Sequence, residues 1–208
     1  MPSPAPPAVL SEAFRELSIV PPPAAIEMLV RLVEMVELWG GRLNLTGHRD
    51  SDSITRRLVL DAVALLVHLP SFETAADLGA GAGFPGLPIA VLKPECRVFL
   101  VEARERRHHF QRHAIRELGL ENVEAIHGRF EQLEPVACDL VVAQAVAAPA
   151  VLVESMRRWA RPGAAIVVPG GATPRQVGAQ PGIASAEAVS YEVPLGGPRR
   201  TLWLGRTL

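Results

Sequence analysis

The stretch between residues 75 and 86 constrains the fold of this chain more than any other. It reads AADLGAGAGFPG, in which an apolar run containing Asp77 continues into a segment with four glycines. Glycine adopts the positive φ angles of a tight strand-to-helix turn, and its missing Cβ lets a ligand lie against bare backbone. The following segment, 87–92, is expected to be helical. The pattern predicts a nucleotide-type cofactor site at the carboxyl end of the first strand of an α/β sheet.

Two overlapping motifs in this loop point to different cofactors. Residues 81–86 satisfy G-x-G-x-x-G, and Glu102 follows about twenty residues later, as in dinucleotide-binding proteins. Residues 77–83 satisfy D-x-G-x-G-x-G, the form associated with S-adenosylmethionine. The methionine part of that cofactor carries an ammonium and a sulfonium, which the Asp77 carboxylate would complement through water or backbone relays. The loop favours a methyltransferase over a dehydrogenase and over a structural glycine turn, but it excludes neither alternative.

Composition limits the remaining possibilities. A chain of 208 residues with 49% hydrophobic and 21% charged residues is long enough for one globular domain with a small appendage. The formal net charge of −1 argues against a general basic coat for nucleic acid, although it allows a local patch. Cys96 and Cys138 lack metal-ligand spacing, so we expect reduced thiols and no metal. No apolar run reaches membrane length and no leader pattern begins the chain, so the expected location is the cytoplasm.

The hydrophobic pattern divides the chain into a helical extension, residues 1–70, and an alternating part, residues 71–208, which we expect to form one compact unit. Helices are expected at 11–17, 25–39 and 51–69, the second ending at the glycine pair 40–41. The elements expected after the loop are strands at 97–101, 123–126, 140–143 and 164–168, helices at 104–118 and 150–160, a flexible loop at 170–182, and strands at 188–193 and 201–204. This order predicts a parallel sheet with helices on both faces and a closing antiparallel hairpin.

Motifs spread over residues 39–170 resemble those of one family. They are Trp39, Asn44-Leu45-Thr46, Arg57, Leu60-Asp61, Asp77-Leu78-Gly79, the run Gly83-Phe84-Pro85-Gly86-Leu87-Pro88, Arg106-Arg107 with Phe110, Leu118-Gly119-Leu120, Asn122-Val123, and Arg129 with Glu131. The run 83–88 is the most specific, because a generic methyltransferase loop rarely continues into two prolines. On these motifs the chain resembles the bacterial small-subunit ribosomal RNA guanine-N7 methyltransferases (RsmG, formerly GidB), as a divergent member.

The resemblance implies a Rossmann-like class I methyltransferase fold, S-adenosyl-L-methionine as cofactor, and methyl transfer to guanine N7 of 16S ribosomal RNA. It also implies ribosomal RNA or the small ribosomal subunit as partner, no membrane, and a monomer. Glu102 is expected to bind the ribose hydroxyls, unless it is simply exposed, and Phe130 with Glu131 to border the adenine, unless they begin an ordinary helix. The implied cofactor-binding residues are Asp77, Gly79, Gly81, Gly83, Phe84, Glu102, Phe130, Glu131 and Gln144.

The resemblance places Asn44 and Arg57 in the pocket for the methyl acceptor. For Asn44, a turn residue that caps its own backbone is a nearly equal alternative. Guanine N7 carries a lone pair and no proton, so its methylation requires alignment of the reacting atoms and no general base. The basic helix that begins near residue 104 is a further candidate for phosphate contact, although a solvated helix exterior is the slightly favoured alternative.

The chain departs from the family pattern at four positions on the expected substrate face. Leu58 replaces a histidine, Ala62 a serine, Gln144 an arginine and Pro169 a lysine. The change at Gln144 removes a positive charge and a bidentate phosphate ligand. Four such losses leave open a second hypothesis, a catalytically degenerate or retargeted relative that binds the cofactor. A nicotinamide-dependent oxidoreductase is a remote third, because the helical extension and terminal hairpin disfavour it.

Overall fold

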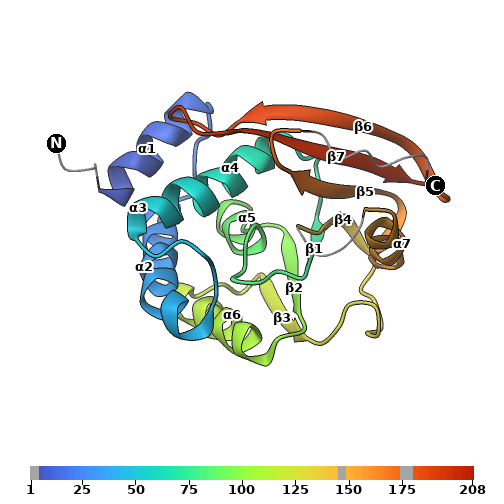
Figure 1. The fold of residues 1–208 in the computed structure, drawn as a ribbon, viewed down its shortest axis with the longest axis horizontal. Coiled ribbons are helices and arrows are strands. Elements are labelled where there is room, and N and C mark those ends of the chain that lie inside the picture. Colours follow the sequence, from blue (N-terminus) through green and yellow to red (C-terminus); the bar gives the residue numbers. More distant parts are fainter. Residues whose placement is uncertain (1–4, 145–148, 174–179) are drawn as a thin grey trace.

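A single seven-stranded sheet with the order β3-β2-β1-β4-β5-β7-β6 organises the protein (Figure 1). The structure, a computed structural model, describes residues 5–144, 149–173 and 180–208. Neighbouring strands from β3 to β5 are parallel, whereas β7 is antiparallel to both β5 and β6. The strands are β1 (Thr74–Leu78), β2 (Arg97–Glu102), β3 (Val123–His127), β4 (Cys138–Val142), β5 (Ala160–Gly170), β6 (Ile183–Glu192) and β7 (Arg199–Thr207). The predicted parallel sheet with a terminal antiparallel hairpin is confirmed.

Helices cover both faces of the sheet, most of them on one side. They are α1 (Pro6–Glu16), α2 (Ala25–Leu43), α3 (Ser51–Ile54), the π-helical turn η1 (Thr55–Val59), α4 (Leu60–Val67), α5 (Gly86–Leu92), α6 (Glu105–Leu118) and α7 (Pro149–Trp159). Strand residues that alternate along the chain enter two separate hydrophobic clusters, because successive side chains of a strand point to opposite faces. Thus Leu100 packs with the helices α1 to α6, whereas Val101 packs with α7.

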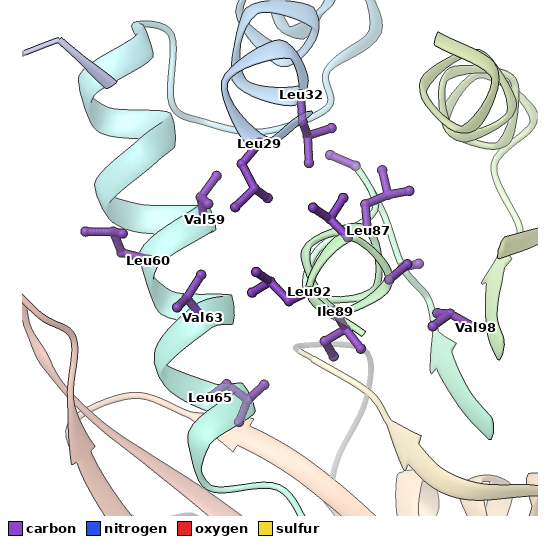
Figure 2. Close-up of a cluster of buried hydrophobic side chains, with 14 of the residues drawn as sticks. Leu29, Leu32, Val59, Leu60, Val63, Leu65, Leu87, Ile89, Leu92 and Val98 are labelled. Atoms are coloured by element: carbon purple, nitrogen blue, oxygen red, sulfur yellow. The ribbon is translucent and has the colours of Figure 1, made fainter. Parts of the chain in front are cut away.

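The N-terminal helices share a core with the sheet. Figure 2 shows Leu29 and Leu32 of α2 facing Leu87 of α5, with Val59 of the π turn beside them. All four side chains are fully buried. Complete burial of such a side chain is worth about 1.5–3 kcal/mol. Residues 1–70 therefore contribute to the same core as residues 71–208, and the boundary at residue 70 stays a prediction.

Several predicted boundaries differ from the structure. The first helix begins at Pro6 and not at residue 11, and the hairpin strands begin at Ile183 and Arg199 and not at 188 and 201. The second helix continues through the glycine pair 40–41 to Leu43, because Gly40 is buried and leaves room for the following segment at His48 and Arg49. The helix expected at 51–69 is interrupted by the π turn and ends at Val67, and its N-cap is Asp50, whose carboxylate accepts a bond from the Ser53 N–H. Strand β5 extends well beyond the predicted 164–168, because it pairs with β7 as far as residue 170. Part of the loop expected at 170–182 lies outside the described residues.

Candidate cofactor and acceptor site

A cavity of about 530 Å³ lies at the carboxyl ends of the parallel strands. In open α/β sheets ligands bind at this edge, where the order of the strands reverses, and here the reversal falls between β1 and β4. The cavity is lined by Leu45, Thr46, Leu58, Gly79, Ala80, Gly81, Ala82, Phe84, Glu102, Ala103, Arg104, Arg107, Arg129, Phe130, Glu131 and Gln144. Seven of the nine predicted cofactor-binding residues are in this lining; Asp77 and Gly83 are not.

Gly83 shapes the glycine loop from outside the cavity. Its φ of +87° lies in the left-handed region, and a Cβ built on it would be 2.4 Å from Cδ1 of Leu87. Only glycine allows the loop to pass this close to the first turn of α5.

The N–H groups of Gly79 and Ala80 both donate to the carbonyl oxygen of Val101, at 2.8 and 3.1 Å. The loop is therefore tied back to β2 as it leaves β1.

Asp77 lies beneath the loop. Its side chain is buried, and its Oδ2 accepts a 2.9 Å hydrogen bond from the N–H of Gly86. Burial raises the pKa of this carboxyl to about 7, the Gly86 hydrogen bond opposes the rise, and the nearby charge of Glu102 adds to it. Asp77 can act on a bound cation only through the loop backbone and its electric field. Its indirect role in cofactor binding stays a prediction.

Glu102 and Gln111 hold Gly81 from both sides. The Glu102 carboxylate accepts hydrogen bonds from the N–H groups of Gly81, at 2.9 Å, and of Arg104, at 2.7 Å. The Gln111 Nε2 donates to the Gly81 carbonyl oxygen at 2.9 Å. Glu102 is buried in the cavity wall, so the exposed alternative for it is wrong. Sequence reasoning missed Gln111, although it is three residues before Ala114 and so lies near the buried stripe of its helix.

The opposite wall is the turn after β3. Phe130 is buried there, and its carbonyl oxygen accepts a 3.1 Å bond from Nε1 of Trp159, itself fully buried. Arg158 donates to the carbonyl oxygen of Glu131 at 2.5 Å. Helix α7 therefore fixes this turn from behind. No sequence motif indicated that Arg158 and Trp159 support the wall, because the contact joins residues 27 to 29 positions apart.

A family model described as rRNA small subunit methyltransferase G matches residues 25–185. The chain belongs to this family. A protein of that name from Methylobacillus flagellatus is 32% identical over 71% of this chain and 72% of its own length. Another from Neisseria meningitidis is 35% identical over 59% of each chain, so the chain spans about three fifths of such relatives.

Solved structures resemble the fold more widely. A SAM-dependent methyltransferase from Aquifex aeolicus has a TM-score of 0.56 at 19% identity, covering 75% of this chain and 93% of its own. An O-methyltransferase from Bacillus cereus in complex with SAH has a TM-score of 0.58 at 18% identity, covering 86% and 91%. The Rossmann-like class I methyltransferase fold expected for the family is thus confirmed.

Of the two residues predicted for the acceptor pocket, Arg57 lines a cavity, and Asn44 lines neither that cavity nor the larger one. Asn44, exposed and left-handed at φ +50°, ends α2, and its carbonyl oxygen accepts a 3.0 Å bond from Arg107, which lines the cavity. Its position therefore fits the turn interpretation. Arg57 lies on the π turn and lines a second, small cavity of about 30 Å³. We call this small cavity the acceptor cavity, after the predicted role of Arg57. It shares Leu58, Phe84 and Gln144 with the larger cavity.

All four positions at which the chain departs from the rRNA small subunit methyltransferase G pattern line the acceptor cavity. Leu58, Ala62 and Pro169 come from η1, α4 and β5, and Gln144 follows β4. They lie together, as the resemblance implied. The lining is therefore hydrocarbon at Leu58, Ala62 and Pro169, where the resemblance leads one to expect histidine, serine and lysine. The carboxylate in that lining belongs to Asp61.

Asp61 joins α4 to the terminal hairpin. Its Oδ1 accepts a 3.3 Å bond from the Tyr191 hydroxyl, and its Oδ2 lies 3.1 Å from Nη2 of Arg200. Burial raises the pKa of the Asp61 carboxyl, and the Arg200 charge opposes the rise. Tyr191 also lines the acceptor cavity, so this cluster fixes the hairpin against the wall of that cavity.

The part of the chain that the structure describes contains neither a group of metal-ligating side chains nor a helix that could span a membrane. No three His, Cys, Asp or Glu side chains there are grouped to hold a metal, and Cys96 and Cys138 are separate, buried and free. None of the described helices is long and apolar enough to cross a bilayer. On α6, a hollow is lined by His109, Arg112, His113 and Arg116, and its predicted contact with phosphate stays a prediction.

Proposed function

We propose that this protein is an S-adenosyl-L-methionine-dependent methyltransferase that acts on guanine N7 of 16S ribosomal RNA. The observation that carries the proposal is the adjacency of two cavities at the strand ends, joined through Leu58, Phe84 and Gln144. Membership of the rRNA small subunit methyltransferase G family supports the reaction and the substrate. We infer a cytoplasmic, monomeric enzyme whose partner is ribosomal RNA or the small ribosomal subunit.

The residues of the larger cavity fit the cofactor. Its volume of about 530 Å³ is in the range of small-molecule sites, roughly 300–1,000 Å³. Bare backbone at Gly79 and Gly81 provides a surface for the methionine part, Glu102 provides an acceptor for ribose hydroxyls, and Phe130 provides an apolar wall for adenine. The Glu102 carboxylate already binds two N–H groups, which hold its oxygens in place before any ligand arrives.

The cofactor supplies an electrophilic methyl group on a cationic sulfur. The guanine N7 lone pair forms the new bond to the methyl carbon as the carbon–sulfur bond breaks, and no proton is transferred. The enzyme must therefore align the base and exclude water, which is proximity and orientation catalysis. Phe84 and Leu58, which line both cavities, are positioned to hold the base at the junction. The reaction requires no polar group at positions 62 and 169, so the apolar residues Ala62 and Pro169 are compatible with it.

Methyl incorporation tests the proposal directly. Small ribosomal subunits lacking the modification would be incubated with the protein and radiolabelled cofactor, with fully modified subunits as the control. Label in guanine N7 of the unmodified subunits alone is the expected result. Calorimetry with S-adenosylmethionine and with NAD would accompany it. Cofactor binding without incorporation into either naked RNA or subunits would overturn the assigned reaction, and binding of NAD instead would overturn the cofactor.

A further inference from the structure

A third cavity, of about 340 Å³, lies beyond the acceptor cavity. It is formed between the π turn, through Arg56 and Arg57, and the tip of the β6–β7 hairpin, residues 194–198. Arg57 lines both this cavity and the acceptor cavity, so the three cavities form a row along the strand ends. A nucleic acid strand that presents one base at the junction of the first two cavities would pass over the third.

The two arginines of this cavity differ in their partners. Nε of Arg56 is 2.9 Å from Oδ1 of Asp52, one turn earlier, so its charge is already compensated. Arg57 is exposed and pairs with no carboxylate in residues 5–144, 149–173 or 180–208. The cavity lining contains no acidic side chain. Because the whole chain carries a formal charge of −1, this cationic site is a local feature and does not follow from composition.

The opposite wall of the cavity is a fixed turn. The N–H of Leu195 donates to the Glu16 carboxylate of α1 at 3.0 Å, and the N–H of Gly197 donates to the Val193 carbonyl oxygen at 3.0 Å. A Cβ on Gly197 would lie 2.8 Å from that same oxygen, so the turn requires glycine. In Figure 1 this end of the hairpin lies beside α1 and α4. This wall of the cavity is therefore held in place by α1 and by the turn itself.

We propose that this third cavity binds a backbone phosphate of the RNA next to the methyl-acceptor nucleotide, with the Arg57 guanidinium as its ligand. The inference rests on the proposed function for the presence of RNA, and it moves Arg57 from the base to the backbone. A guanidinium presents paired N–H donors that match the oxygens of a phosphate. Contacts of this kind position the strand and carry no sequence information.

The experiment compares RNA binding by the full-length protein with that of three variants over a range of salt concentrations. Arg57→Gln removes the charge, Arg57→Lys keeps it, and Arg97→Gln is the matched control. Arg97 is also an exposed arginine, but it is the first residue of β2 and so lies at the end of the strand opposite to the cavities. It pairs with Glu124. The probe is a 16S ribosomal RNA fragment, measured by fluorescence anisotropy, with cofactor binding measured separately by calorimetry.

The plot of log affinity against log salt concentration has a negative slope. For one lost phosphate contact, this slope should be less steep by about 0.7–0.9 in Arg57→Gln than in the wild type. Arg57→Lys should keep the slope, and Arg97→Gln should match the wild type. KM for RNA should rise roughly tenfold in Arg57→Gln, an effect of about 1.4 kcal/mol. An unchanged slope and KM in Arg57→Gln would overturn the inference. If the wild type bound no cofactor in calorimetry, the proposed function would be overturned instead, so the two failures are distinguishable.

Discussion

The Asp77 carboxylate and the Gly86 N–H form a 2.9 Å hydrogen bond that joins the end of β1 to the start of α5 beneath the glycine loop. The acid that the D-x-G-x-G-x-G motif contributes thus supports the floor of the loop, whereas Glu102 lines the cavity itself. This division of roles leads to distinct expectations for the two residues.

The stability of the protein should fall as the pH rises toward 7, because of Asp77. Its pKa is raised from 3.8 to about 7, so the folded state holds a proton that the unfolded state has released. The resulting stabilisation is complete below about pH 4 and is lost as the pH passes through about 7. At about 1.4 kcal/mol per pKa unit, the loss is on the order of 4 kcal/mol.

Urea unfolding of the wild type and of Asp77→Asn at several pH values between 5 and 8 measures this contribution. The asparagine variant keeps an oxygen acceptor for Gly86 but cannot ionise, so its free energy of unfolding should depend less on pH. Asp61, whose pKa is also raised, remains in both proteins and cancels in the comparison. Parallel curves for the two proteins would contradict the assignment.

Gly86→Ala should destabilise the protein by about 1–3 kcal/mol through overpacking. A Cβ at this position would lie 2.2 Å from Cδ2 of Leu100 and 3.0 Å from Oδ2 of Asp77. Gly47→Ala is the control, because no atom lies within 4 Å of its added Cβ, and it should change stability by less than about 0.5 kcal/mol. Thermal unfolding compares the two; equal melting temperatures would show that the loop tolerates side chains.

Glu102→Gln should weaken cofactor binding by about tenfold to a hundredfold, or roughly 1.4–2.7 kcal/mol. In the wild type, the two Glu102 oxygens accept one hydrogen bond each from the N–H groups of Gly81 and Arg104. A glutamine side chain has one oxygen, so it can satisfy only one of these two N–H groups in the same way. The unsatisfied N–H loosens the loop, and the charged acceptor for ribose is lost. Calorimetry measures the affinity, with Glu105→Gln, at an exposed position on α6, as the control. Equal affinities for both variants would remove Glu102 from the site.

Asp61→Asn should cost about 2–4 kcal/mol, because it leaves Arg200 partly buried without a counter-charge. Asp52→Asn breaks a more exposed ion pair with Arg56 and should cost less than about 1 kcal/mol. Chemical denaturation gives both values. If the two costs were equal, the Asp61 cluster would not be what fixes the hairpin to α4.

The glycine loop and the alternation of strands and helices could be predicted from local sequence, because they depend on backbone conformation and on the period of apolar residues. The meeting of Gly79, Gly81 and Glu102 in one cavity wall could be predicted for the same reason, since parallel strands end at one edge of a sheet. The continuation of α2 through Gly40 could not be predicted. The weak helix propensity of glycine is overridden there by packing against the segment that follows.

Local patterns in the chain were enough to indicate the family, the parallel sheet and the edge at which a cofactor would bind. Folding decided that one cavity is lined by Leu58, Ala62, Gln144 and Pro169. It also decided that Gln111 donates a hydrogen bond to the carbonyl oxygen of Gly81 in the glycine loop. Folding also placed Arg57 opposite the hairpin tip with no carboxylate partner among the described residues. These relationships join residues far apart in the chain, and their distances are set by packing of the whole core, which no short-range pattern records.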